Sequence, residues 1–276
     1  LQREPLGTAD AVRAGIDALA ADTDETVVLS GDVPLIEAAS IEAVVAARRA
    51  AGTPMALAAV DAEDASGYGR ILLGDGDRVV RIVEHKDATH AEREITLYNG
   101  GLYAFDARWL RDALPRVEPS AATGELYLTA LVDLAAADGT PALAVREPAD
   151  ADWELEFAGI NDRADLADVS VALQYERVLV PLMRAGVTIQ DPATAYVDAT
   201  VQIAADVTLE PNVHLRGGTR IGRDTVIGSG SQVIDSTIGE LCRVWSSVIE
   251  SSTVGNEVKV GPFAHVRPGC DIGDGA

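Results

Sequence analysis

The segment "VQIAADVTLEPNVHLRGGTRIGRDTVIGSGSQV", residues 201–233, carries an aliphatic residue at every sixth position from Ile203 to Val233. This spacing matches neither the 3.6-residue period of an α-helix nor the two-residue alternation of a half-buried strand. A six-residue repeat predicts a parallel β-helix, in which each rung points one aliphatic side chain inward and the next rung covers it. The alternative is a run of short solvated strands in a sandwich.

The repeat extends on both sides of this segment, and its spacing slips to five or six residues toward Ala276. Small or turn-forming residues follow the aliphatic ones, as in "IGRDTV" (221–226). The hexapeptide pattern resembles the left-handed β-helices, which are an exception to the usual right-handed crossover. The aliphatic positions are Val197, Ile203, Leu209, Leu215, Ile221, Ile227, Val233, Ile238, Val244, Ile249, Val254, Val260, Val266 and Ile272.

Residues 1–185 alternate helical and strand patterns instead. This alternation predicts an α/β, Rossmann-like domain with a mostly parallel sheet and a small antiparallel insertion. We therefore expect one domain at 1–185, a linker at 186–196 and an all-β domain at 197–276. The expected helices are 8–20 (N-cap Thr8), 40–52 (N-cap Ser40, stop Gly52) and 125–139; the expected strands are 26–30, 55–60, 96–105 and 153–161, with a hairpin at 69–84.

The composition excludes several classes of function. Acidic residues outnumber basic ones 44 to 22, and the net charge of −22 argues against a nucleic-acid partner, which requires a basic face. No apolar run of about 18 residues is present, so no membrane span is expected. The two cysteines, Cys242 and Cys270, lack metal-ligand spacing and fit a reducing, cytoplasmic compartment.

The stretch "VVLSGDVPLI" (27–36) is a strand pattern that ends in a carboxylate. Open α/β sheets bind their ligands at the carboxyl ends of strands, so Asp32 is a candidate metal ligand. Gly31 leaves the approach free of a side chain, and Pro34 prevents the strand from continuing normally. The alternative is an Asx-type turn with no ligand.

Seven short motifs follow one another in a characteristic order, and the chain resembles the bacterial bifunctional UDP-N-acetylglucosamine pyrophosphorylases / glucosamine-1-phosphate N-acetyltransferases over essentially its whole length. Each motif is weak alone, and the order makes the set specific. The motifs are "QREPLGTADAV" (2–12), "SGDVPLI" (30–36), "GYGRI" (67–71), "IVEHKDAT" (82–89), "YNGGLYAF" (98–105), "GIND" (159–162) and "DPATAYVD" (191–198).

The resemblance implies a Mg²⁺-dependent uridylyl transfer from UTP to N-acetylglucosamine-1-phosphate, with release of pyrophosphate. It implies that Asp32 and Asn161 are the two protein ligands of Mg²⁺, which prefers oxygen. For Asn161, the alternative is a cap on a helix that begins near Asp162. The product, UDP-N-acetylglucosamine, would supply precursors of peptidoglycan and lipopolysaccharide.

The resemblance also implies a set of substrate-binding residues. A plain helix entry is the alternative for Gly7 and Thr8, and a surface ion pair with Lys86 is the alternative for Glu84. His85 is expected to be solvated. The implied set is Gln2, Gly7 and Thr8 for uridine, Gly69, Glu84 and Asn99 for the N-acetylglucosamine unit, and Ser30 and Gly31 beside the Asp32–Asn161 pair.

A second activity is implied for the β-helix, acting as a homotrimer: acetyl-CoA-dependent acetylation of glucosamine-1-phosphate. "GPFAHVRPG" (261–269) resembles the stretch whose arginine meets the sugar phosphate, which assigns Arg267. Neither His214 nor His265 is assigned a catalytic role. The resemblance places a glycine-rich loop with a lysine before Leu1, and the acetyltransferase base beyond Ala276. The chain is therefore expected to be a fragment that does not turn over alone.

Two rival functions stay open. One is a sibling nucleotidyltransferase that makes ADP-glucose, dTDP-glucose or GDP-mannose. The other is a non-catalytic regulatory subunit of the same architecture, in which Asp32 and Asn161 would be incidental.

Overall fold

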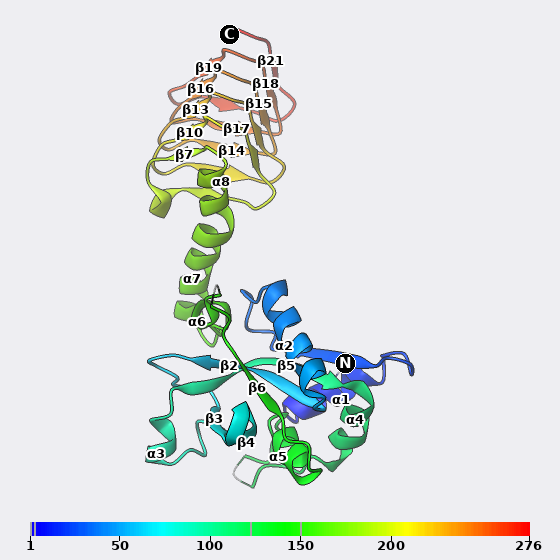
Figure 1. Ribbon diagram of the computed structural model, residues 1–276. Helices are drawn as coiled ribbons and strands as arrows, with labels where there is room; N and C mark the ends of the chain where they lie inside the picture. Colours follow the sequence, from blue (N-terminus) through cyan, green and yellow to red (C-terminus); the bar gives the residue numbers. More distant parts are fainter. Residues whose placement is uncertain (1, 3, 122, 150) are drawn as a thin grey trace. The chain divides into compact units, whose positions relative to one another are not determined.

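The computed structural model describes residues 2, 4–121, 123–149 and 151–276. The chain divides into two compact units, Leu1–Asn161 and Asp162–Ala276 (Figure 1). Among the described residues, no helix combines the length and the apolar character that crossing a membrane requires.

The first unit is built around a six-stranded sheet in the order β4-β3-β5-β2-β6, with β1 also paired to β5. The predicted mostly parallel sheet is wrong: β5 is antiparallel to β1, β2 and β3, and among the described pairs only β2–β6 is parallel. A strand buried on both faces gives a continuous apolar run whichever way it points, so the run in β5 does not report its direction. The strands are β1 (Glu25–Leu29), β2 (Met55–Asp61), β3 (Arg70–Leu73), β4 (Val79–Val83), β5 (Leu97–Asp106) and β6 (Leu143–Arg146).

Helices cover both faces of this sheet. Along β2, Met55, Leu57 and Ala59 join one hydrophobic core, and the alternate residues 56, 58 and 60 join a second. The first core takes in residues of α1, α4 and α5, and the second takes in residues of α2 and α6. The helices are α1 (Thr8–Ile16), α2 (Ala38–Ala51), α3 (His90–Arg93), α4 (Ala107–Ala113), α5 (Ala130–Ala137) and α6 (Trp153–Glu156), with 3₁₀ turns η1 (Asp75–Asp77) and η2 (Leu114–Arg116).

Several of the predicted elements need correction. The N-caps are Gly7 and Glu37 rather than Thr8 and Ser40, whereas Gly52 ends α2 in the left-handed conformation as expected. Helix α5 begins at Ala130, so 125–129 is a loop. Residues 153–161 form the short helix α6 and a loop instead of a strand, because Asp152 caps the Leu155 N–H. Strand β6 was not predicted.

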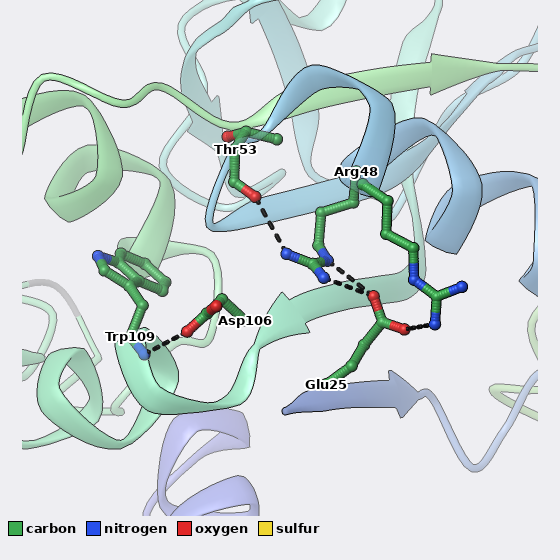
Figure 2. A network of polar contacts seen from close by, with 6 residues as sticks. Glu25, Arg48, Thr53, Asp106 and Trp109 are labelled. Atoms are coloured by element: carbon green, nitrogen blue, oxygen red, sulfur yellow. Dashed lines mark hydrogen bonds and ion pairs between the residues drawn. The ribbon is translucent and has the colours of Figure 1, made fainter. Parts of the chain in front are cut away.

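An ion-pair cluster fastens the start of β1 to the end of α2 (Figure 2). Both Nε and an Nη of Arg48 donate to one Glu25 oxygen, at 3.0 and 2.6 Å, and Arg49 donates to the other at 2.5 Å. Arg48 also donates to the Thr53 carbonyl oxygen at 3.3 Å. Burial alone raises the pKa of Glu25, but the arginine hydrogen bonds outweigh it and hold this pKa below its ordinary value.

The second unit is a parallel β-solenoid with three five-stranded sheets, in which each strand pairs with the third strand after it. In one sheet Ile203, Ile221, Ile238, Val254 and Ile272 stack directly over one another. The other predicted aliphatic positions stack in the same way on the two remaining sheets and form one continuous core, so the six-residue repeat is confirmed. The left-handed sense of the solenoid stays a prediction.

The strands of the solenoid are two or three residues long. They are β7 (Thr188–Ile189), β8 (Tyr196–Val197), β9 (Gln202–Ile203), β10 (Thr208–Leu209), β11 (His214–Arg216), β12 (Arg220–Ile221), β13 (Val226–Ile227), β14 (Gln232–Ile234), β15 (Thr237–Ile238), β16 (Arg243–Val244), β17 (Val248–Glu250), β18 (Thr253–Val254), β19 (Lys259–Val260), β20 (His265–Val266) and β21 (Asp271–Ile272), with a 3₁₀ turn η4 (Pro192–Thr194).

The solenoid unit begins earlier than the sequence predicts. Strand β7, inside the expected linker 186–196, pairs with β10. A continuous helical segment precedes it, formed by α7 (Arg163–Ala172), the π-helical η3 (Leu173–Leu179) and α8 (Val180–Arg184). Val178 and Leu179 are buried in the solenoid core, so this helix belongs with 162–276 and not with the α/β unit. Asp162 is the N-cap of α7. The alternative considered for Asn161 was a cap on a helix that begins near Asp162, and a helix does begin there.

Candidate active site

A cavity of about 790 Å³ opens in the first unit, and it collects most of the residues that the motifs singled out. Of the eleven predicted substrate-binding residues, all but Gln2, Gly7 and Arg267 line it. The predicted residues in its lining are Thr8, Ser30, Gly31, Asp32, Gly69, Glu84, Asn99 and Asn161.

Asp32 and Asn161 both line the cavity although they are far apart in the chain. Strand β1 ends at Leu29, and the Ser30 N–H donates to the Gly101 carbonyl oxygen at 3.1 Å. Two residues later the Asp32 carbonyl oxygen accepts the Ile160 N–H at 2.9 Å. This backbone bond holds the loop before Asn161 against the end of β1, and it leaves the Asp32 carboxylate outside the main-chain pairing.

A turn at residues 65–69 forms another part of the lining. The buried Arg70 guanidinium donates to the carbonyl oxygens of Ala65 and Tyr68, and these two bonds hold the turn in its conformation. The Tyr68 hydroxyl accepts the Gly159 N–H at 2.9 Å, and the Gly69 carbonyl accepts the Asn99 N–H at 2.9 Å. The turn is therefore bonded both to β5 and to the segment that carries Asn161.

Glu84 projects into the cavity from just after β4. The Thr129 hydroxyl donates to its Oε1 at 2.7 Å. Among the ion pairs of the described residues none joins Glu84 to Lys86, and the carboxylate instead accepts the Thr129 hydroxyl. A Cβ added at Gly69 would lie 3.0 Å from the Ile82 side chain, a tight approach, and 3.5 Å from Glu84, an ordinary van der Waals contact.

Asn99 is held by its neighbours on β5. Its Nδ2 donates to the Tyr103 hydroxyl at 2.5 Å, and its Oδ1 accepts the Gly101 N–H at 3.2 Å. Burial raises the pKa of Tyr103 well above the ordinary value of a tyrosine, so this hydroxyl is neutral at physiological pH.

The predicted uridine-reading residues have structural partners of their own. Gln2 Nε2 donates to Asp10 at 2.7 Å, and the Thr8 hydroxyl accepts the Leu128 N–H at 2.8 Å. Gly7 has a φ of 123°, and a Cβ there would lie 2.5 Å from the Leu126 carbonyl oxygen. The packing of residues 6–9 on residues 126–128 thus requires a glycine at position 7, independently of any contact with a nucleotide.

Sequence reasoning missed three tyrosines and a threonine in the lining: Tyr68, Tyr103, Tyr127 and Thr129. Tyr127 and Thr129 stood inside a helix that was predicted to begin at residue 125, which hid the loop that brings them to the cavity. Tyr68 adjoins Gly69 in "GYGRI", and that adjacency was the available signal.

The polar residues singled out in the β-helix lie in the second unit. Arg267 is exposed, and its carbonyl oxygen accepts the Ser252 hydroxyl at 2.7 Å. His265 is paired with Glu250 at 2.7 Å, and the His214 ring stacks on Tyr196 with centroids 4.9 Å apart.

Comparison with known proteins agrees with this architecture. The nucleotidyl transferase family model matches residues 1–154, and the bacterial transferase hexapeptide model (six repeats) matches residues 200–235. The chain is similar to three proteins named bifunctional protein GlmU, from Shouchella clausii (39% identical over 274 residues), Paenarthrobacter aurescens (41% over 277) and Anaeromyxobacter dehalogenans (43% over 274).

These alignments cover 99% of this chain but only 59%, 54% and 55% of the three relatives, so the chain spans a little over half of their length. The family match to residues 1–154 covers more than half of the 276 residues and includes all of the cavity except its Gly159–Asn161 edge. The chain belongs to the nucleotidyl transferase family and continues into a hexapeptide-repeat solenoid.

Proposed function

We propose that the cavity is the nucleotide-sugar site of a UDP-N-acetylglucosamine pyrophosphorylase, which transfers a uridylyl group from UTP to N-acetylglucosamine-1-phosphate. The observation that carries the proposal is the convergence of Asp32, Asn161, Glu84 and Asn99 on one cavity, from four separate segments. A turn-forming role for Asp32 alone would not require the other three. The similarity of the whole chain to proteins named bifunctional protein GlmU supports the same assignment.

In this reaction a phosphate oxygen of the sugar 1-phosphate attacks the α-phosphorus of UTP. The bond from that phosphorus to the bridging oxygen breaks, and pyrophosphate leaves. Both reactants are anionic, so the site must offset their repulsion and align them. Mg²⁺, when bound, supplies charge neutralisation and a template for the phosphate oxygens.

The residues present fit a magnesium ion. Mg²⁺ uses one or two protein oxygens and completes its shell with water and substrate phosphates. Asp32 offers carboxylate oxygens and Asn161 an amide oxygen in the lining of the cavity. Within the described residues, no group of three or more His, Cys, Asp or Glu side chains could hold a metal, which argues against a zinc-type centre.

The remaining polar groups suit the two ends of a nucleotide sugar. The Glu84 carboxylate can accept from sugar hydroxyls, and Asn99 offers both a donor and an acceptor. Gly69 leaves room beside Glu84. We assign Thr8, with Gln2 and Gly7 behind it, to the uridine end, and Ser30 and Gly31 to the stretch beside the phosphates.

A ligand panel tests this assignment. UDP-N-acetylglucosamine, UDP-glucose, ADP-glucose and GDP-mannose are each titrated into the chain with Mg²⁺, by calorimetry and by thermal unfolding. At equal concentration, a ligand that binds only the folded state raises the unfolding temperature more when it binds more tightly, and UDP-N-acetylglucosamine should raise it most. Preference for ADP-glucose or GDP-mannose would favour a sibling enzyme, and stabilisation by none of the four would favour a regulatory subunit.

A pair of variants localises the binding. Glu84→Gln should weaken binding of UDP-N-acetylglucosamine by about tenfold, because a carboxylate is the stronger acceptor. Glu118→Gln, an exposed carboxylate outside the cavity lining, should leave the affinity unchanged.

We extend the proposal to acetyl-CoA-dependent acetylation of glucosamine-1-phosphate by a protein of the relatives' full length, with Arg267 contacting the sugar phosphate. It includes a cytoplasmic homotrimer formed through the solenoid and the supply of cell-wall and lipopolysaccharide precursors. The hexapeptide match and the exposure of Arg267 support this part. Light scattering on the purified chain tests the trimer.

A further inference from the structure

The amide of Asn99 has only one orientation that satisfies its neighbours. The Gly101 main-chain N–H can only donate, so the atom of Asn99 that faces it, at 3.2 Å, must be the oxygen. The nitrogen therefore faces the Tyr103 hydroxyl at 2.5 Å and donates to it. If the amide flipped, two donors would meet at Gly101.

The Tyr103 ring is held in place by burial, ring stacking and backbone pairing. The residue is 5% exposed within β5, and its ring stacks on Phe105 with centroids 5.9 Å apart. Its backbone is paired on both sides, with Val28 of β1 and Leu57 of β2. The hydroxyl oxygen is thus held in place on β5, where it accepts from the Asn99 nitrogen.

The fixed amide presents a defined hydrogen-bonding face to the cavity. After bonding Tyr103, the Asn99 nitrogen retains one N–H. Glu84, on the same cavity, can only accept when ionised. A sugar hydroxyl can satisfy either group, but a carbonyl oxygen can satisfy only the N–H.

We propose that Tyr103 is a positioning residue for sugar selectivity: by locking the Asn99 amide, it keeps an N–H directed at the carbonyl of an acetamido sugar. This inference rests on the proposed function and names what selects the N-acetylated sugar over one with a plain hydroxyl. Tyr103 acts through Asn99 and needs no contact of its own with the sugar.

The test compares affinities for UDP-N-acetylglucosamine and UDP-glucose, measured by calorimetry with Mg²⁺. Tyr103→Phe should lower the preference for the acetamido sugar by about three- to tenfold, the effect of one neutral hydrogen bond. Tyr98→Phe is the matched control on the same strand. The Tyr98 residue is 2% exposed, does not line the cavity, and its hydroxyl makes no hydrogen bond in the part of the chain that the structure describes. The Tyr98→Phe variant should prefer UDP-N-acetylglucosamine over UDP-glucose as strongly as the unmodified chain does.

A double-mutant cycle separates positioning from a general loss of packing. In an Asn99→Ala background, Tyr103→Phe should change the preference no further. Asn99→Asp keeps an acceptor toward Gly101 but removes the N–H, so it should abolish the preference for the acetamido sugar. This second variant keeps the inference testable if Tyr103→Phe does not fold. An unchanged preference in Tyr103→Phe, or an equal change with and without Asn99, would overturn the inference. Failure of the unmodified chain to bind either nucleotide sugar would overturn the proposed function as well.

Discussion

The main-chain N–H of Ile160 donates to the carbonyl oxygen of Asp32 at 2.9 Å. This bond fixes the segment before Asn161 against the end of β1 without using either candidate ligand side chain. Substitution of the Asp32 or Asn161 side chain should therefore change the chemistry of the cavity and leave its framework in place.

A second bond on that segment predicts the effect of Tyr68→Phe. The substitution removes the acceptor of the Gly159 N–H, which is 2.9 Å away. We expect about 1 kcal/mol of lost stability and a higher Mg²⁺ concentration for half-maximal binding of UDP-N-acetylglucosamine, because the Asn161 loop loses an anchor. The ring of Tyr98 packs on that of Tyr68 with centroids 4.3 Å apart, so Tyr98→Phe is a suitable control. Equal Mg²⁺ dependence in both variants would show that the hydroxyl does not position the loop.

Gly7→Ala should destabilise the first unit. The added Cβ would lie 2.5 Å from the Leu126 carbonyl oxygen, and the φ of 123° disfavours any side chain. We expect a loss of about 1–3 kcal/mol in the free energy of unfolding. Gly15→Ala in the same helix α1 meets no atom within 4 Å and should stabilise by about 0.5–1 kcal/mol. Urea unfolding measures both, and a neutral Gly7→Ala would contradict the packing of 6–9 on 126–128.

Removing the buried hydroxyl of Ser252 should lower the stability of the solenoid more than removing the exposed hydroxyl of Thr253. Ser252 is buried; it donates to the Arg267 carbonyl oxygen at 2.7 Å and accepts the Cys270 N–H at 3.2 Å. Ser252→Ala leaves both groups without this partner and should cost about 1–3 kcal/mol. Thr253→Ala removes an outward-facing hydroxyl and should cost far less. Similar losses of unfolding free energy in the two variants, measured with urea, would refute a stabilising role for the Ser252 hydroxyl.

Acid should weaken the first unit through Asp138. Hydrogen bonds from Arg116, at 2.8 and 2.9 Å, and then from Trp109 lower the pKa of Asp138 from its ordinary value of 3.8 to about 2. A depressed pKa in the folded state contributes stability that is fully present above pH 3.8 and is lost as the pH falls toward 2. In Arg116→Gln this loss should be smaller. The difference in unfolding free energy between the unmodified chain and the variant, followed across this range, should shrink with acid; a constant difference would contradict the assignment.

The repeat region was the most predictable part of the chain because its period reports burial directly. Every rung buries one aliphatic residue, so the stacked positions from Val197 to Ile272 could be taken from spacing alone. Strand β7 was not predicted because the turn at Pro192–Thr194 interrupts the six-residue period between β7 and β8. The predicted strand at 153–161 failed because the alternation in "WELEF" also suits one helical turn, and the Asp152 cap decided the outcome.

Partners that are distant in sequence explain the other misses. Ser40 was taken as an N-cap from its residue type, yet its hydroxyl donates to the buried Glu156 at 2.6 Å and accepts Trp153 Nε1 at 2.9 Å. Eight of the eleven predicted site residues line one cavity because motif order carries information about a shared site. The hydrogen bond from Asn99 to the Tyr103 hydroxyl could not be predicted, since an aromatic residue in a buried strand looks like any other core residue.

The most direct test of the account is whether Asp32 and Asn161 hold one divalent cation beside the nucleotide sugar. Mn²⁺ serves as the probe, and its paramagnetic resonance signal reports free and bound ion in the presence of UDP-N-acetylglucosamine. The account predicts that Asp32→Asn and Asn161→Ala each weaken Mn²⁺ binding by at least about tenfold, whereas Asp112→Asn, an exposed carboxylate away from the cavity, leaves it unchanged. Mn²⁺ affinity in Asp32→Asn and Asn161→Ala equal to that of the unmodified chain would contradict it.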